Sequence, residues 1–128
     1  YSLLQKEIEQ YQEYNFDYAI LDEAQHIKNR GTRNAKSVKL IKARHRLILT
    51  GTPIENSLEE LWSLFDFLMP GLLSTYDRFI EKYIRSPSQE KGNNLENLKK
   101  KLSPFILRRM KKDVLEELPP VSEIIYYC

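Results

Sequence analysis

Cysteine is scarce in this chain of 128 residues, since Cys128 is the only one. A disulfide framework within the chain is therefore excluded, which mildly favours a reducing compartment. No apolar stretch approaches the roughly 18 residues that a membrane-spanning helix needs, and no secretory signal pattern opens the chain. We therefore expect no membrane contact. The net charge is only +2, so any affinity for nucleic acid has to come from a local basic cluster.

Glycine is also rare, with four residues at positions 31, 51, 71 and 92. None of them forms the pattern G-x-x-x-x-G-K-S/T, the loop that holds nucleotide phosphates in many ATPases. The remaining composition, 41% hydrophobic and 30% charged, is typical of a globular domain. Because the first residue is Tyr1 rather than methionine, we expect a piece of a longer protein.

The first half of the chain predicts a strand, a crossover helix and a second strand, which is the pattern of a parallel sheet. An amphipathic helix is expected before this unit. The predicted elements are a helix at 2–14, a strand at 16–22 that is buried on both faces, a polar loop, a helix from Thr32, and a strand at 46–50.

The second half is mostly helical. Ser57 and Glu60 have the spacing of a capping box before an apolar helix, and Pro70-Gly71 predicts its end. Further predicted elements are a helix at 75–85, a flexible loop at 86–94, a helix that carries Leu95, Leu98 and Leu102, a last helix from Ser103, and a strand at 121–128.

The most informative stretch is ILDEAQHI, in which an apolar run ends in Asp22 and Glu23. A buried parallel strand that ends in two acids places both at the sheet edge where such sheets bind ligands. A site that hydrolyses phosphates needs one carboxylate for Mg²⁺ and another for the attacking water. A strand that merely ends in a polar turn explains the same residues. The acid pair alone therefore does not distinguish a catalytic site from an ordinary turn.

A second polar loop, Thr50-Gly51-Thr52-Pro53, follows the second predicted strand. Its glycine permits close approach of the backbone, and its proline stops the strand. An ordinary turn again explains it. Two such strand ends separated by one crossover helix would nevertheless lie side by side, and we expect this loop to hydrogen-bond to the acid loop.

Three blocks of the sequence belong together: DEAQH followed by IKN, then LTGTPIENSLEELWSLFDFLMPG, then PFILRRMKKDVLEELPP. In combination they resemble the Swi/Snf family of helicase-like, DNA-dependent ATPases. Their order and spacing are similar to those of the family and cover nearly the whole chain. The spelling TPIENSLEELWSL resembles bacterial members more than eukaryotic chromatin remodellers.

The resemblance implies a role for each acid and for its neighbours. Asp22 would bind Mg²⁺ through water, and Glu23 would be the catalytic base of ATP hydrolysis in the Walker B motif. Residues that would couple nucleotide state to DNA contacts are Gln25, His26, Thr50, Gly51 and Thr52.

The resemblance also implies an α/β fold, namely a partial RecA-like parallel sheet of the P-loop NTPase type with a mostly helical insertion. Residues 1–56 would be the C-terminal part of the first lobe, 57–118 the helical insertion, and 119–128 a strand or linker toward the second lobe. The phosphate loop and the second lobe's motifs, including the arginine finger, are absent from this sequence. We therefore expect this chain alone neither to hydrolyse ATP nor to bind it tightly.

A basic cluster places seven positive charges in fourteen residues, in 99–112. Such a cluster can contact DNA phosphates, but in a generic sequence it is more often a solvated helix face, here partly balanced by acids. In the family context, contacts with DNA compete with contacts between the lobes. The residues considered for these contacts are Arg108, Arg109, Lys111 and Lys112.

For the parent protein these features predict an ATP-driven translocase on double-stranded DNA that remodels or displaces bound proteins. Expected partners are double-stranded DNA, DNA-bound proteins or RNA polymerase, and the remainder of the same motor. The expected localisation is cytoplasmic, at a bacterial nucleoid, or nuclear if the protein is eukaryotic. Two alternatives stay open: another DExx-box motor, such as a restriction-type translocase or an RNA helicase, and a non-enzymatic scaffold that binds DNA or protein.

Overall fold

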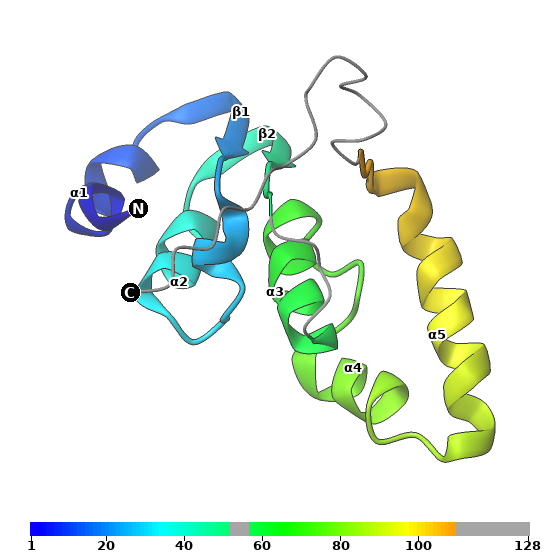
Figure 1. Cartoon of the computed structure of the whole chain (residues 1–128). Coiled ribbons are helices and arrows are strands. Elements are labelled where there is room, and N and C mark those ends of the chain that lie inside the picture. The colour runs from blue at the N-terminus through cyan, green and yellow to red at the C-terminus, as the bar shows by residue number, and fades with distance from the viewer. Residues whose placement is uncertain (52–56, 110–128) are drawn as a thin grey trace, which may run out of the picture. The chain divides into compact units, whose positions relative to one another are not determined.

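The structure is a computed structural model that describes residues 1–51 and 57–109. By its contacts the chain divides into two compact units, residues 1–94 and the part from Leu95 onward. The elements are α1 (Ser2–Gln12), β1 (Asn15–Leu21), the 3₁₀-helix η1 (Ala24–Ile27), α2 (Arg33–Lys39), β2 (Lys42–Ile48), α3 (Leu58–Leu68), α4 (Tyr76–Tyr83), α5 (Ser88–Leu102) and the 3₁₀-helix η2 (Ser103–Phe105) (Figure 1).

The two strands pair in parallel, in a register that runs from Asn15 opposite Lys42 to Leu21 opposite Ile48. The connection between them contains α2, which begins where the Thr32 hydroxyl accepts a hydrogen bond from the Ala35 N–H at 3.2 Å. This confirms the predicted strand–helix–strand unit and the α/β class. The second strand begins earlier than predicted, at Lys42 rather than Arg46.

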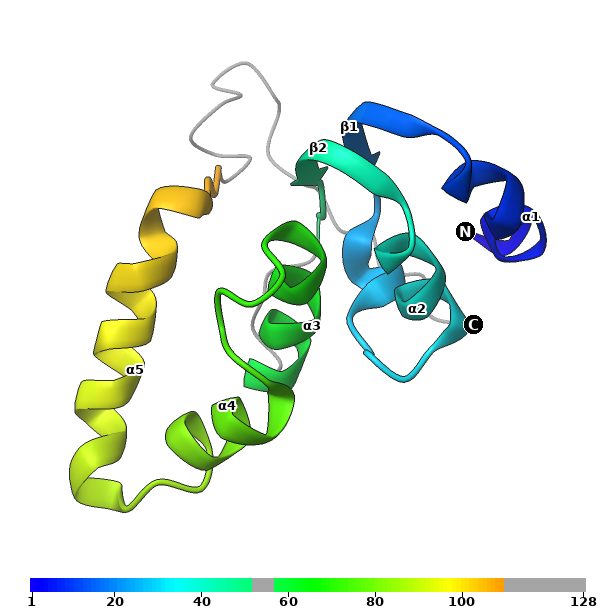
Figure 2. The same ribbon diagram turned by 180° about the vertical axis from the view of Figure 1, so that it is seen from behind.

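One face of the sheet is covered by helices. Buried residues of β1, η1, α2 and α3 form one apolar core, against which Ala43 and Ile48 of β2 pack. The core residues are Ala19, Leu21, Ala24, Ile27, Ala35, Val38, Leu64 and Phe67. Opposite views of the ribbon show η1 between α2 and α3, next to the ends of the strands (Figures 1 and 2). The loop that carries the acids is therefore anchored in the same core as the sheet.

The other face of the sheet is open in the described part of the chain. Tyr18, Ile20 and Leu47 are 64%, 56% and 46% exposed, so the prediction that the first strand is buried on both faces is wrong here. The reason is the alternation of side chains along a strand, which gives one set to the helices and the other set to the opposite face. Such a row of exposed apolar side chains is typical of a sheet face that packs against further helices or strands.

The helical half confirms three predicted helices, the third being the one that carries Leu95, Leu98 and Leu102 in α5, and it corrects the prediction of a loop. The Ser57 hydroxyl caps α3 by accepting from the Glu60 N–H at 3.1 Å, and α4 follows at Tyr76–Tyr83. Of the predicted loop at 86–94, only residues 86 and 87 lie outside a helix, because α5 begins at Ser88. Its first turn is started by the Pro87 carbonyl, which accepts from the N–H groups of Glu90 and Lys91, each at 3.0 Å.

The predicted helix from Ser103 is only the short 3₁₀-helix η2, because Ile106 adopts extended angles of φ −119° and ψ 122°. The predicted strand at 121–128 lies outside the described residues. Within 1–51 and 57–109, no helix has the length and apolar character that crossing a membrane requires.

Candidate functional site

The acid pair lies where β1 ends and η1 begins. Both carboxylate side chains are exposed, and the Glu23 N–H donates to the Asp22 Oδ1 at 2.8 Å. Glu23 adopts the left-handed conformation, with φ 49° and ψ 53°. The backbone therefore turns at Glu23, directly after the strand that Asp22 follows.

The left-handed backbone of Glu23 is a local strain. For a residue with a Cβ this conformation costs about 1–2 kcal/mol, and such residues gather at functional sites where the surroundings hold them. Here the surroundings are the buried ends of η1, since Ala24 and Ile27 are both 0% exposed. The fold thus stabilises an acid in a geometry that its own backbone disfavours.

Gln25 bridges the acid loop to the end of β2. Its Nε2 donates to Glu23 Oε2 at 2.7 Å, and its Oε1 accepts from the Thr50 hydroxyl at 3.2 Å. Backbone hydrogen bonds run beside this bridge, from the Leu49 N–H to the Leu21 carbonyl at 2.8 Å and from the Ala24 N–H to the Leu49 carbonyl at 3.0 Å. The expected hydrogen bonding between the two strand ends is confirmed.

Tyr1 covers the other side of the acid loop. Its hydroxyl donates to the Asp22 carbonyl at 2.7 Å, and its ring lies 5.0 Å from the His26 ring, centroid to centroid. Burial raises the pKa of the Tyr1 hydroxyl above its ordinary value, and the negative charges of Asp22 and Glu23 raise it further. The hydroxyl therefore stays protonated around neutral pH and keeps donating to the loop.

The structure brings five of the predicted site residues into one cluster: Asp22, Glu23, Gln25, His26 and Thr50. Gly51 follows Thr50 in the chain, next to this cluster. A Cβ at Gly51 would meet no described atom within 4 Å, so the predicted close approach of another segment to the Gly51 backbone is not seen among the described residues. Arg108 and Arg109 are exposed residues of the unit that begins at Leu95. Thr52, Lys111 and Lys112 lie outside the described residues.

Sequence reasoning missed two residues that hold the loop, Tyr1 and Ser63. Ser63 interrupts the apolar stripe of α3 and is 0% exposed, and a serine inside such a stripe was the available signal. For Tyr1 the sequence offered no signal, because its contact joins residues that are 21 positions apart.

Asp22 and Glu23 are the residues that the sequence predicts for a metal site. Their carboxylate oxygens are the kind of ligand that a hard cation prefers. Asp22 accepts one N–H bond, whereas a carboxylate has about four acceptor positions, so it retains capacity for water molecules around an ion. No group of three or more acidic, histidine or cysteine side chains with metal-binding geometry occurs in 1–51 and 57–109.

Comparison with known proteins adds a family. The profile of the SNF2-related domain matches residues 1–128. Human TATA-binding protein-associated factor 172 is 44% identical over 140 aligned positions, which cover 100% of this chain. TATA-binding protein-associated factor MOT1 of Saccharomyces cerevisiae is 52% identical over 128 positions, which cover 91% of this chain. This chain spans only 8% and 7% of those two relatives.

A solved structure agrees with the fold. The Sulfolobus solfataricus SWI2/SNF2 ATPase core in complex with double-stranded DNA superimposes with a TM-score of 0.80 at 42% identity, covering 92% of this chain and 25% of that chain. The resemblance to the Swi/Snf family and the assignment to a RecA-like lobe are thereby confirmed.

The expected localisation in a bacterial cytoplasm is wrong. The two curated relatives described above are eukaryotic TATA-binding protein-associated factors, so the spelling TPIENSLEELWSL does not indicate a bacterial source. A short block that is shared across the family carries little information about the kingdom of its source.

At most positions with ordinary backbone angles, a glycine variant is less stable than an alanine variant. The strain at Glu23 predicts the opposite order at this position. Glu23→Gly should give a free energy of unfolding about 1 kcal/mol higher than Glu23→Ala, because glycine adopts positive φ without a steric penalty. Both variants lose the same carboxylate, so its hydrogen bond to Gln25 cancels in the comparison. Urea denaturation of the two variants measures the difference.

The matched control lies in α1, where Glu9 is exposed and helical. There Glu9→Gly should be less stable than Glu9→Ala by about 1 kcal/mol. If the alanine variant is the more stable one at position 23 as well, the backbone there is not strained.

Proposed function

The chain belongs to the SNF2-related domain family, and from this membership we propose that it is part of an ATP-dependent DNA motor of Swi/Snf type. In this proposal the parent protein couples ATP hydrolysis to movement along double-stranded DNA. The observation that carries it is the acid pair at the carboxyl end of β1, which Gln25 bridges to Thr50 at the end of β2. The similar archaeal structure is an ATPase core in complex with double-stranded DNA, which supports the same activity.

We assign different work to the two acids. Asp22 would hold Mg²⁺ through water, and the ion supplies charge neutralisation at the phosphates when it is bound. Glu23 would orient the attacking water and accept its proton. The turn at Glu23, φ 49°, supports this division because the backbone leaves the line of the strand directly after Asp22.

Gln25 is proposed to report the state of Glu23 to the loop after β2. A carboxylate that accepts a proton becomes a weaker acceptor for an amide N–H, so the 2.7 Å bond from Gln25 to Glu23 is sensitive to the reaction. The other end of the same amide accepts from Thr50. His26, Gly51 and Thr52 are proposed to share this coupling role, as the family resemblance implies.

The remaining assignments concern parts of the motor beyond this site. Residues 1–56 are proposed as the end of the first RecA-like lobe, 57–118 as the helical insertion, and 119–128 as a strand or linker. Arg108, Arg109, Lys111 and Lys112 are proposed to contact DNA or the second lobe. The names of the two TATA-binding protein-associated relatives favour a DNA-bound protein as a further partner, and RNA polymerase stays a second prediction.

The role of Glu23 is tested by Glu23→Gln in the full-length protein. The amide keeps the size of the side chain but cannot accept the proton, so ATP turnover should fall by about 10²–10⁴-fold while ATP binding is retained. Turnover and nucleotide affinity are measured separately, with double-stranded DNA present. Turnover close to that of the unmodified protein would remove Glu23 from the role of base.

The chain of residues 1–128 on its own should show no ATP turnover with DNA and no tight ATP binding, because the phosphate loop is absent from its sequence. An ATPase assay and a nucleotide-binding titration on the purified chain check this. Normal turnover by this chain alone would mean that the chemistry does not depend on the missing loop.

A further inference from the structure

We propose that three side-chain contacts form a clamp that ties residues 27–30, directly after η1, to α3 and α4. The three contacts are Ser63 to Ile27, Lys28 to Glu60, and Arg30 to Tyr76. The clamp makes α3 and α4 follow the acid loop, so that DNA-stimulated ATP turnover depends on it. The inference rests on the proposed function, since it concerns how the same site is coupled to the helical half.

The first contact is buried. The Ser63 hydroxyl donates to the Ile27 carbonyl at 2.7 Å across 36 positions of sequence, and both residues are 0% exposed. A buried carbonyl without a donor is unfavourable, so α3 and the end of η1 cannot separate without leaving this group unsatisfied. Ser63 is therefore a positioning residue for the loop and does not itself touch the acids.

The second contact is an ion pair. Lys28 Nζ lies 3.2 Å from Glu60 Oε1, and the two side chains are 48% and 25% exposed. Glu60 is in the first turn of α3, where its own N–H already donates to the Ser57 hydroxyl. The carboxylate thus connects the start of α3 to the segment after η1.

The third contact reaches α4. The Arg30 guanidinium lies 3.8 Å above the centre of the Tyr76 ring, well within the range of a cation–π interaction. The Tyr76 ring in turn meets Trp62 of α3 edge-on, with centroids 5.3 Å apart. Arg30 therefore contacts a pair of aromatic rings that joins the two helices.

The clamp lies at one end of η1, and the acid loop lies at the other. Helix η1 has four residues, and a 3₁₀-helix rises about 2 Å per residue, so the distance between the strained Glu23 and the clamp is short. Both buried ends of η1 are closely packed, and packed elements transmit displacements because interiors are nearly incompressible. A displacement of Glu23 on nucleotide binding is passed to residues 27–30 and, through the clamp, to α3 and α4.

The test is a charge exchange in the full-length protein. We compare Lys28→Glu, Glu60→Lys and the double exchange, and measure ATP turnover with and without double-stranded DNA, KM for ATP, and DNA affinity. Each single exchange should lower DNA stimulation by about three- to fivefold, the size expected for a partly exposed ion pair, with KM for ATP unchanged. The double exchange should restore stimulation to within about twofold.

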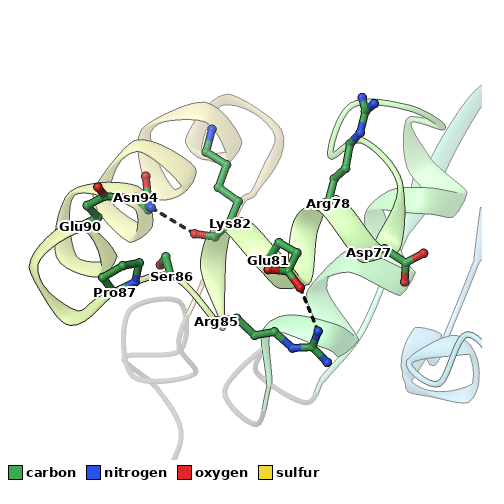
Figure 3. A pocket seen from close by; sticks show the side chains of 9 residues that line it. All are labelled: Asp77, Arg78, Glu81, Lys82, Arg85, Ser86, Pro87, Glu90 and Asn94. Carbon is green, nitrogen blue, oxygen red and sulfur yellow. Dashed lines mark hydrogen bonds and ion pairs between the residues drawn. The ribbon is translucent and has the colours of Figure 1, made fainter.

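A matched control is the ion pair between Glu81 of α4 and Arg85, which follows the end of that helix; Arg85 Nη1 lies 2.8 Å from Glu81 Oε1 (Figure 3). Its side chains are 69% and 64% exposed, and it makes no part of the clamp. Exchange of these two charges should leave DNA stimulation unchanged. A second arm compares Tyr76→Phe, which keeps the ring and should retain stimulation, with Tyr76→Leu, which should lower it.

The outcomes separate the two proposals. Normal DNA stimulation in the single exchanges, including the case in which only the melting temperature falls, overturns the clamp and leaves the proposed function standing. Weakened DNA binding that the double exchange does not rescue also overturns it, because Lys28 would then act as a phosphate contact. If the unmodified full-length protein shows no ATP turnover, the proposed function fails and the clamp falls with it.

Discussion

The parallel pairing of β1 with β2 is the constraint on which the candidate site depends. Parallel strands end at the same edge of a sheet, so the register that sets Leu21 opposite Ile48 also brings the residues after each strand together. The Leu49 N–H and carbonyl continue the ladder to Leu21 and Ala24. An amide on one loop can then reach a hydroxyl 25 positions away on the other.

The packing beneath the strands determines how firmly this edge is held. Helices α2 and α3 share one core with the buried sheet face and with both ends of η1. That core supplies the rigidity that a left-handed glutamate requires, because strain persists only where neighbouring contacts outweigh it. Strain at Glu23, burial of η1 and the contacts of α3 are thus consequences of one arrangement.

Much of the first half was predictable because its signals are local. The apolar runs, the capping threonine at position 32 and the change from apolar to acidic residues each act within a few positions, and the structure confirms the elements they predict. The two polar strand ends also predicted their own contact, since parallel topology dictates which edge they share.

The remaining features depend on contacts that the sequence does not reveal. Residues 86–94 contain proline, glycine and asparagines, which favour loops, yet they lie mostly within α5 (Ser88–Leu102). One tertiary contribution is the amide of Asn94, whose Nδ2 donates to the Lys82 carbonyl at 3.1 Å and joins α5 to α4 (Figure 3). The exposed sheet face was not predicted either. A hydrophobic run predicts that a strand is buried, but it does not show which other elements of the protein bury it. The role of Tyr1 likewise became visible only from its contact with the Asp22 carbonyl, and the serine in the apolar stripe of α3 did not by itself reveal that Ser63 contacts Ile27.

In the proposed function, Gln25 links the chemistry at Glu23 to the loop after β2 by way of Thr50. This coupling is measured by a double-mutant cycle with Gln25→Ala and Thr50→Val, read as DNA-stimulated ATP turnover of the full-length protein. We expect strong non-additivity, of about 0.5–3 kcal/mol, so that the double variant is no slower than the slower single variant. If the two losses multiply, the residues act independently and the claimed link is contradicted.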